Sequence, residues 1–174
     1  MDPAWLKEHV RDIPDYPKPG VVFRDITPLL GAPDAFSATV DAIAAPFADE
    51  QIDKVLGIEA RGFVFAAPVA YRHAAGFVPV RKAGKLPWKI EREEYELEYG
   101  TDLLEIHHDA VTPGERVLIV DDVIATGGTA AATARLAERL GGIVLGFAFV
   151  IELEFLEGRK RLDGYDVHSL VSYE

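Results

Sequence analysis

Two adjacent carboxylates, followed by a run of small and hydroxylated residues, form the stretch whose side chains suggest chemistry most directly. Asp121 and Asp122 come after the apolar residues Val117 to Val120, and Ala125-Thr-Gly-Gly-Thr129 follows shortly after them. Glycines let a backbone turn tightly and bring its N–H groups close to a ligand, and a helix N-terminus adds free donors and a partial positive charge. The stretch therefore predicts a phosphate cradle beside two acids that could hold sugar hydroxyls or an ion, which suggests a phosphorylated sugar.

The elements that position these groups follow from the apolar pattern around them. The run Val117–Val120 indicates a strand that is buried on both faces, as in a parallel sheet. The alanine-rich run from Ala130 to Leu140 predicts a helix that the Thr-Gly-Gly-Thr segment opens, with Gly141-Gly142 as its C-cap. Because ligands of open α/β sheets bind beyond the carboxyl ends of the strands, the two acids are expected at that edge.

The rest of the chain alternates helix-like and strand-like patterns, which predicts an α/β fold. Asp34 is expected to cap a helix from Ala35 to about Ala48, and residues 83–97 are interpreted as a long, charged connection of the kind that often forms a lid. The other expected segments are a helix over 3–11, an extended turning segment over 13–20, an irregular apolar segment over 21–30, a strand over 54–58, a turn over 59–62, a helix over 63–73, strands over 76–81 and 143–151, a hairpin over 98–107, a short helix over 155–162 and a last strand over 165–172.

Length and charge argue against several classes of protein. The 174 residues favour a single domain with a sizeable core. The formal net charge of −11, from 18 basic and 29 acidic residues, argues against binding to nucleic acid. No apolar run approaches the roughly 20 residues of a membrane span, and the N-terminus does not look like a signal peptide. We therefore expect a protein that does not bind membranes. The chain also has no cysteine, which fits a cytoplasmic location.

An anionic substrate would have to meet locally placed cations or a metal ion on such an acidic protein. Basic residues gather in one third of the chain, at Arg61, Arg72, Arg81, Lys82, Lys85 and Lys89. The histidines show no ligand spacing, and we interpret His107-His108 as a surface pair rather than as a metal site.

The stretch around Asp121 has a plain alternative, a βα turn with a capping residue. It is neither a Walker A loop, because no Gly-Lys-Ser/Thr follows, nor a Gly-x-Gly-x-x-Gly motif. The combination of strand, Asp-Asp, Thr-Gly-Gly-Thr and helix resembles the motif by which type I phosphoribosyltransferases bind phosphoribosyl diphosphate (PRPP). Gly57-Ile-Glu-Ala-Arg-Gly-Phe63 is similar to the diphosphate-binding loop of that family. That loop contains a non-proline cis peptide, and the matching bond here is Glu59–Ala60.

Further segments are similar to the adenine-specific branch of this family, and the resemblance extends from about Ile13 to Tyr173. The chain departs from the pattern at Ala60, where some relatives carry Ser, and at Trp88, an unexpected large aromatic residue in the predicted lid. The segments that carry the resemblance to this branch are Pro19–Pro28, Arg81–Pro87 and Tyr95–Gly100.

The resemblance implies a fold and an activity. The fold would be that of type I phosphoribosyltransferases, a central, mainly parallel sheet flanked by helices, with a small N-terminal hood over residues 1–33 and a flexible lid over 83–100. The activity would be the conversion of adenine and PRPP to AMP and diphosphate, a step of purine salvage. Mg²⁺ would bind substrate oxygens near Asp121 and Asp122, without direct ligands from the protein, and the protein would be a homodimer.

The resemblance also implies roles for individual residues. Glu98 would carry a proton for the purine, and Arg61 would act on the departing diphosphate. The ribose 5-phosphate would bind Asp121, Asp122, Ala125, Thr126, Gly127, Gly128 and Thr129. The diphosphate would bind Glu59, Ala60, Arg61, Arg81, Lys82 and Lys85. The base would bind Val22, Phe23 and Arg24.

Alternatives stay open for single residues and for the whole protein. Phe23 could be an ordinary core aromatic residue, and Glu98 a solvated carboxylate like its neighbours Glu94 and Glu96. A phosphoribosyltransferase for another purine, such as hypoxanthine or xanthine, is one rival function. A non-catalytic regulator that senses PRPP is another, although the net charge and the basic lid argue against it.

Overall fold

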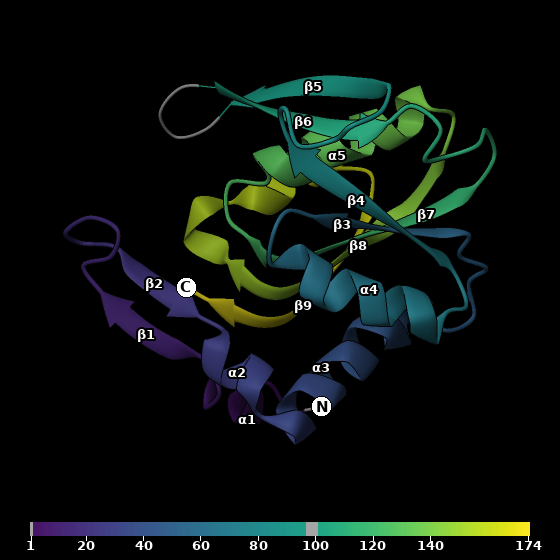
Figure 1. The fold of residues 1–174 in the computed structure, drawn as a ribbon. Helices are drawn as coiled ribbons and strands as arrows, with labels where there is room; N and C mark the ends of the chain where they lie inside the picture. Colours follow the sequence, from purple (N-terminus) through teal and green to yellow (C-terminus); the bar gives the residue numbers. More distant parts are fainter. Residues whose placement is uncertain (1, 97–100) are drawn as a thin grey trace.

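The computed structural model describes residues 2–96 and 101–174, and these form a sheet of seven strands with helices on both faces (Figure 1). Strands β4, β3, β7, β8 and β9 run parallel to their neighbours, whereas β6 and β5 are antiparallel additions beside β4. The fold is therefore α/β with a mainly parallel sheet, as the sequence predicts. In sheet order the strands are β5 (Ile90–Glu96), β6 (Thr101–His107), β4 (Gly76–Lys82), β3 (Lys54–Ile58), β7 (Arg116–Ile124), β8 (Ile143–Leu153) and β9 (Asp166–Tyr173).

Strand β7 contributes to two hydrophobic cores, one on each face of the sheet. Because successive side chains of a strand point to opposite faces, Leu118 and Val120 pack with α3 (Pro33–Ala44) and α4 (Gly62–Arg72). Val117 and Ile119 pack on the other face with α5 (Gly128–Arg139). All four side chains are fully buried. A strand that is enclosed in this way holds whatever follows it at a fixed place.

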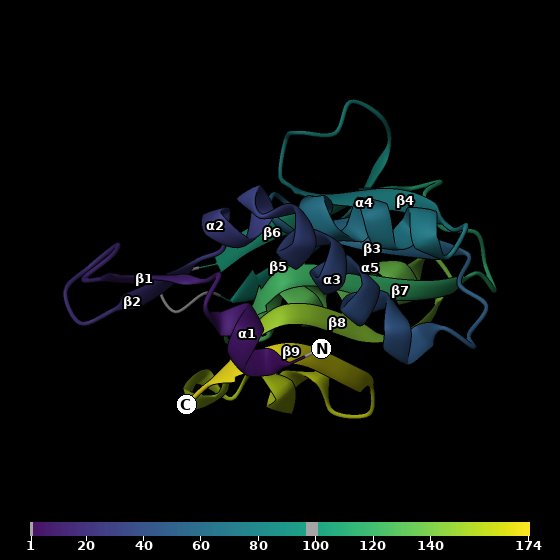
Figure 2. The same cartoon turned by 90° about the horizontal axis from the view of Figure 1, so that it is seen from below.

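The N-terminal segment packs against the sheet and α3 and adds a hairpin beside them. After α1 (Pro3–Lys7), strands β1 (Arg11–Pro14) and β2 (Val22–Asp25) pair with each other as an antiparallel hairpin, and α2 (Thr27–Gly31) follows. The hairpin projects from the body of the molecule in both views (Figure 2). Among the described residues it shares no backbone pairing with the seven-stranded sheet, so contacts of side chains must hold it in place.

Several N-terminal predictions are wrong in detail. Residues 21–30 are not irregular, because they contain β2 and α2. The helix predicted over 3–11 ends at Lys7, and residues 11–14 form β1 instead. Asp34 does not cap the next helix: Pro33 begins α3 after Ala32, and Asp34 lies in its first turn, where proline and acidic residues are both favourable. Helix α3 ends at Ala44, before a 3-10 turn over Ala45–Phe47 that contains a proline.

In the C-terminal half, three expectations also change. The connection predicted over 83–97 contains a strand from Ile90, which pairs with β6 from Ile90↔His107 to Glu96↔Thr101. Strand β7 continues to Ile124, so the two acids lie within it rather than after it. The short helix predicted over 155–162 consists of two 3-10 turns, Glu154–Leu156 and Gly158–Leu162. The strands predicted over 54–58, 76–81, 143–151 and 165–172 are confirmed, with ends that shift by no more than two residues.

The remaining elements agree with the sequence. The turn over 59–62 leads into α4, and helix α5 ends at Arg139 with Gly141 in a left-handed conformation, as expected for a C-cap glycine. No helix in the described part of the chain is long and apolar enough to cross a membrane.

Candidate active site

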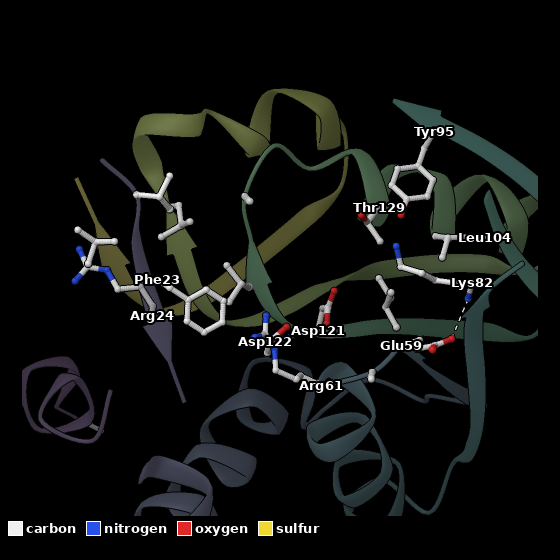
Figure 3. Close-up of a pocket in the computed structure, with 17 residues that line it drawn as sticks. Phe23, Arg24, Glu59, Arg61, Lys82, Tyr95, Leu104, Asp121, Asp122 and Thr129 are labelled. Carbon is white, nitrogen blue, oxygen red and sulfur yellow. Dashed lines mark hydrogen bonds and ion pairs between the residues drawn. The ribbon is translucent and has the colours of Figure 1, made fainter. Parts of the chain in front are cut away.

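A pocket of about 640 Å³ opens at the carboxyl ends of β3, β4, β7 and β8, where the parallel-sheet rule places ligands (Figure 3). The hood hairpin forms one wall and the start of α5 another. Residues far apart in the sequence therefore meet in one cavity. The predicted site residues that line it are Val22, Phe23, Arg24, Glu59, Ala60, Arg61, Lys82, Asp121, Asp122, Ala125 and Thr129.

Asp122 presents a buried carboxylate to this pocket. Its side chain is about 8 % exposed, and the Nε atom of Arg61 lies 2.5 Å from its Oδ2 atom. The contact lacks the geometry of a hydrogen bond, since this buried oxygen has no hydrogen-bond partner. An acceptor without a donor is costly to bury. A hydroxyl group of a ligand would supply the missing donor.

Asp121 is the more strongly perturbed member of the pair. Its Oδ1 atom accepts a hydrogen bond of 2.9 Å from the backbone N–H of Asp122. Helix α4 approaches so closely that a Cβ atom at Gly62 would lie 2.5 Å from this same oxygen. Burial raises the pKa of Asp121 well above its ordinary value, and repulsion from the Asp122 carboxylate raises it further. The two buried acids therefore lower the stability of the folded protein, and a ligand that donates hydrogen bonds to them would offset this cost.

The segment Ala125–Thr129 curves around a second, smaller cavity of about 80 Å³ at the start of α5. Gly127 has a φ of +76° and serves as the N-cap of α5, which has no side-chain cap. The N–H groups of the first helical turn are thus directed at the cavity without a capping side chain, an arrangement suited to a phosphate. Asp121, Thr126 and Thr129 also line this cavity, and Gly128 lies nearby in a third hollow.

Gly158 supports this loop from behind. A Cβ atom on Gly127 would lie 2.3 Å from the Gly158 carbonyl oxygen, and a Cβ on Gly158 would lie 2.3 Å from the Ala125 carbonyl oxygen. Only glycine at both positions allows the two backbones to approach so closely. The 3-10 turn that begins at Gly158 therefore sets the position of the phosphate cradle, a role that the sequence pattern did not indicate.

Glu59 binds Arg81 and Lys85, two of the cations that the sequence assigns to the diphosphate. The Glu59–Ala60 peptide is cis, as the resemblance to the family's diphosphate-binding loop implies. The Glu59 carboxylate accepts hydrogen bonds from Arg81 Nε (3.3 Å), from the backbone N–H of Lys82 (3.0 Å) and from Lys85 Nζ. Burial acts to raise the pKa of Glu59, but the hydrogen bonds from Lys85 and Lys82 outweigh it and leave the pKa below its ordinary value. Glu59 lines the pocket, so its contacts hold Arg81 and Lys85 at the rim.

On the hood side of the pocket, Phe23 presents its ring to the cavity. The ring of Tyr16 packs edge-on against it at 5.3 Å, and the Arg61 guanidinium lies 5.2 Å from its centroid. Phe23 belongs to neither hydrophobic core formed by the described residues. Its position favours a role in the pocket over the alternative of an ordinary core residue.

Several pocket residues did not stand out in the sequence. Tyr95 and Leu104 line the pocket from β5 and β6, and Leu153 lines it from the end of β8. The Tyr95 hydroxyl donates to Asp102 Oδ2 at 3.2 Å, and Lys82 Nζ pairs with the same carboxylate. The sequence could have indicated Leu153, because it is the last residue of a parallel strand. Tyr95 could be placed only once the pairing of β5 with β6 was known. Glu98 lies outside the described residues.

A match to a known protein family identifies the class of protein that has this pocket. The model of the phosphoribosyl transferase domain matches residues 33–171 of the chain. The chain belongs to the phosphoribosyltransferase family.

Individual relatives place this phosphoribosyltransferase more closely. It is 57% identical over 169 residues to the adenine phosphoribosyltransferase of Solibacter usitatus (97% of this chain, 98% of the relative) and 56% identical over 168 residues to that of Thermotoga sp. strain RQ2 (97% and 99%). The crystal structure of the Thermoanaerobacter pseudethanolicus enzyme superposes with a TM-score of 0.96 at 53% identity (99% of this chain, 100% of that one). The Saccharomyces cerevisiae enzyme, complexed with an imino-altritol bisphosphate and adenine, superposes with 0.91 at 43% identity (96% and 97%).

A magnesium ion fits this phosphoribosyltransferase only together with a substrate. Among residues 2–96 and 101–174, no group of three or more His, Asp or Glu side chains is placed to hold a metal ion. Asp121 and Asp122 offer part of a ligand set, and Asp122 Oδ2 lacks a hydrogen bond. Mg²⁺ is commonly held by one or two carboxylates, waters and substrate phosphates. The donor set therefore suits an ion that is carried largely by a phosphorylated substrate.

The contact of Gly158 with the phosphate cradle gives a first prediction. Gly158→Ala would place a methyl group against the Ala125 carbonyl oxygen and force the cradle to shift. Overpacking of this kind costs about 1–3 kcal/mol, so we expect the dissociation constant for PRPP, measured by calorimetric titration, to rise about tenfold or more. Gly31→Ala is the control, because a Cβ there meets no atom within 4 Å. Equal affinity of both variants would contradict the role of Gly158.

The raised pKa of Asp121 gives a second prediction, for stability. The unfolded chain loses the Asp121 proton near pH 3.8, whereas the folded protein keeps it to a higher pH. Between these values the folded state binds more protons, so wild-type stability falls as pH rises. Asp121→Asn has no carboxyl group to deprotonate at this position, so its stability should not fall with rising pH for this reason. We expect chemical denaturation to show the variant more stable than wild type at pH 7, with a difference that shrinks towards pH 3.8, while PRPP affinity falls. A variant less stable than wild type at pH 7 would contradict this account.

Proposed function

We propose that the protein transfers the 5-phosphoribosyl group of PRPP to adenine, which yields AMP and diphosphate. The observation that carries this proposal is the single pocket that joins a hood aromatic residue, a cation-bearing loop, a pair of acids and a phosphate cradle. High identity to adenine phosphoribosyltransferases over nearly the whole chain supports the same reaction.

The acids and the cradle are proposed to hold the ribose 5-phosphate. Asp121 and Asp122 accept hydrogen bonds from the 2′- and 3′-hydroxyls, which supplies the donor that Asp122 Oδ2 lacks. The backbone N–H groups from Ala125 to Thr129, with the hydroxyls of Thr126 and Thr129, bind the 5′-phosphate at the start of α5. Held at both ends, the ribose presents its anomeric carbon to the base.

The cationic loop is proposed to bind the diphosphate. Arg61 lies in the pocket beside Asp122, and Arg81 and Lys85 meet at Glu59 on its rim, while the Lys82 ammonium pairs with Asp102 nearby. As the bond from the anomeric carbon to the diphosphate oxygen breaks, negative charge builds on the leaving group, and these cations stabilise it. Mg²⁺, bound to substrate oxygens near Asp121 and Asp122, adds positive charge at the same place when present.

The base is proposed to bind under the hood. Phe23 stacks on the purine, Val22 contacts its edge, and the backbone of Arg24 reads its polar groups. N9 of adenine forms the new bond to the anomeric carbon on the face opposite the leaving group, with inversion. The ring carbon approaches an oxocarbenium ion, as in other glycosyl transfers. Glu98 is proposed to take up the proton that the imidazole part of the base releases.

The lid and the assembly remain proposals as well. Closure of the segment 83–100 over the pocket would exclude water, which otherwise hydrolyses the reactive sugar. A homodimer is supported by exposed aromatic residues: Trp88 in this segment is 62% and Tyr71 on α4 is 86% exposed in the single chain. The cytoplasmic location stays a prediction.

One assay separates this function from its rivals. The protein is mixed with Mg²⁺, PRPP and, in separate reactions, adenine, hypoxanthine or xanthine, and nucleotide formation is followed by chromatography. We expect AMP from adenine and little product from the other bases. A preference for hypoxanthine or xanthine would favour the rival enzyme. PRPP binding without product from any base would favour the non-catalytic regulator.

The position of Arg61 gives a prediction for the same assay. Arg61→Ala removes a cation from the diphosphate site, and loss of one such group typically lowers the rate about 100-fold or more. The fold should persist, because the Arg61 side chain is nearly half exposed. Arg72→Ala is the matched control, since it breaks only a surface pair with Asp41 and should leave turnover within about twofold of wild type. Unchanged turnover in Arg61→Ala would remove this residue from the mechanism.

A further inference from the structure

The hood hairpin has to be fixed against the sheet by side chains, because no backbone pairing joins it to the sheet among the described residues. Strand β2 nevertheless lines the pocket with Val22, Phe23 and Arg24. A displacement of this strand by even a fraction of an ångström would change how its backbone meets a ligand. The contacts that anchor β2 therefore bear on the affinity for the base.

One of these contacts joins Arg24 to Tyr173 on the last strand. The Arg24 guanidinium stacks on the ring of Tyr173, 3.9 Å from its centroid, and its Nη1 atom pairs with Asp12 on β1. The Nε atom of Arg24 is buried and has no hydrogen-bond partner. With one nitrogen unpaired, the guanidinium depends on the ring and on Asp12 for its position. A cation over an aromatic face is attracted by the ring quadrupole.

Tyr173 is itself well placed to act as an anchor. It is the last residue of β9, and its register partner on β8 is Leu153, which lines the pocket. The ring is half-buried, and burial raises the pKa of its hydroxyl while the nearby Arg24 opposes the shift. Lys7 of α1 also approaches this ring, at 4.8 Å from the centroid.

We propose that Tyr173 is a positioning residue for the base site. Its ring clamps the Arg24 guanidinium and thereby fixes the backbone of β2 against the edge of the sheet. This inference rests on the proposed function, because it assigns β2 to the recognition of adenine. Tyr173 does not line the pocket and contacts no reacting atom. Its loss should therefore weaken the binding of the base and leave the binding of PRPP and the chemical step unchanged.

The test compares two substitutions of Tyr173 in steady-state kinetics with adenine and PRPP varied separately. Tyr173→Leu keeps an apolar side chain but removes the ring, and the KM for adenine should rise about five- to tenfold. The kcat and the KM for PRPP should stay within about twofold. Tyr173→Phe keeps the ring and should restore the wild-type KM for adenine. A rise in both KM values together, or no rise in either, would overturn the proposal.

Two further variants show whether the ring acts through Arg24. Arg24→Met removes the guanidinium from the other side of the contact. If the two residues act as a pair, Arg24→Met and the double variant with Tyr173→Leu should both reproduce the adenine effect of Tyr173→Leu alone. Additive effects would show that the residues act independently. Lys7→Met is the control, because Lys7 approaches the same ring from α1, outside the hairpin strands. An equal effect of Lys7→Met would assign the role to α1.

The outcomes are separable from failure of the proposed function. If the wild-type protein forms no AMP, the function is wrong before the variants are compared. If wild type is active and the adenine KM does not respond to Tyr173→Leu, only the clamp is wrong. Thermal unfolding of each variant checks the fold. Should Tyr173→Leu fail to fold, Arg24→Met carries the same expectation for the KM of adenine and decides the matter.

Discussion

Two adjacent carboxylates inside a strand that is buried on both faces are the constraint on which the rest of the site depends. The apolar residues of β7 fill the cores above and below the sheet, so the strand cannot move to relieve the repulsion between Asp121 and Asp122. Arg61 offsets part of the cost, and the close approach of Gly62 keeps Asp121 enclosed. The fold thus holds a group of acids that a ribose with two hydroxyl donors would satisfy.

Around this fixed pair, the remaining parts of the pocket differ in how they are held. The phosphate cradle is set by backbone against backbone, through the close approach of Gly158 to Gly127 and Ala125. The diphosphate edge is set by ion pairs that converge on Glu59. The hood is held by apolar residues that enter the main core, Leu6, Ile26 and Leu29, and by side-chain contacts of Arg24 and Phe23.

The sequence predicted the parts of this structure that depend on local pattern. The parallel strands, helix α5 and the cis peptide at Glu59–Ala60 all lie where the motifs place them. It missed features that arise from distant pairing: β2 and β5 consist of charged or mixed residues that gave no strand signal, and they pair with β1 and β6. Gly158 was missed for the same reason, because its neighbour across the gap is more than thirty positions earlier in the chain. The role of Glu98 stays a prediction.

The convergence of cations on Glu59 also has a consequence for selectivity. Without a substrate, the Glu59 carboxylate already accepts hydrogen bonds from Arg81, Lys85 and the backbone N–H of Lys82. A single monovalent anion, such as chloride or a free carboxylate, would exchange one negative charge for another and gain nothing from the replacement. A diphosphate brings several charges and many acceptor oxygens to the same cations. An anion that binds here would therefore have to carry more negative charge than the protein's own Glu59 carboxylate.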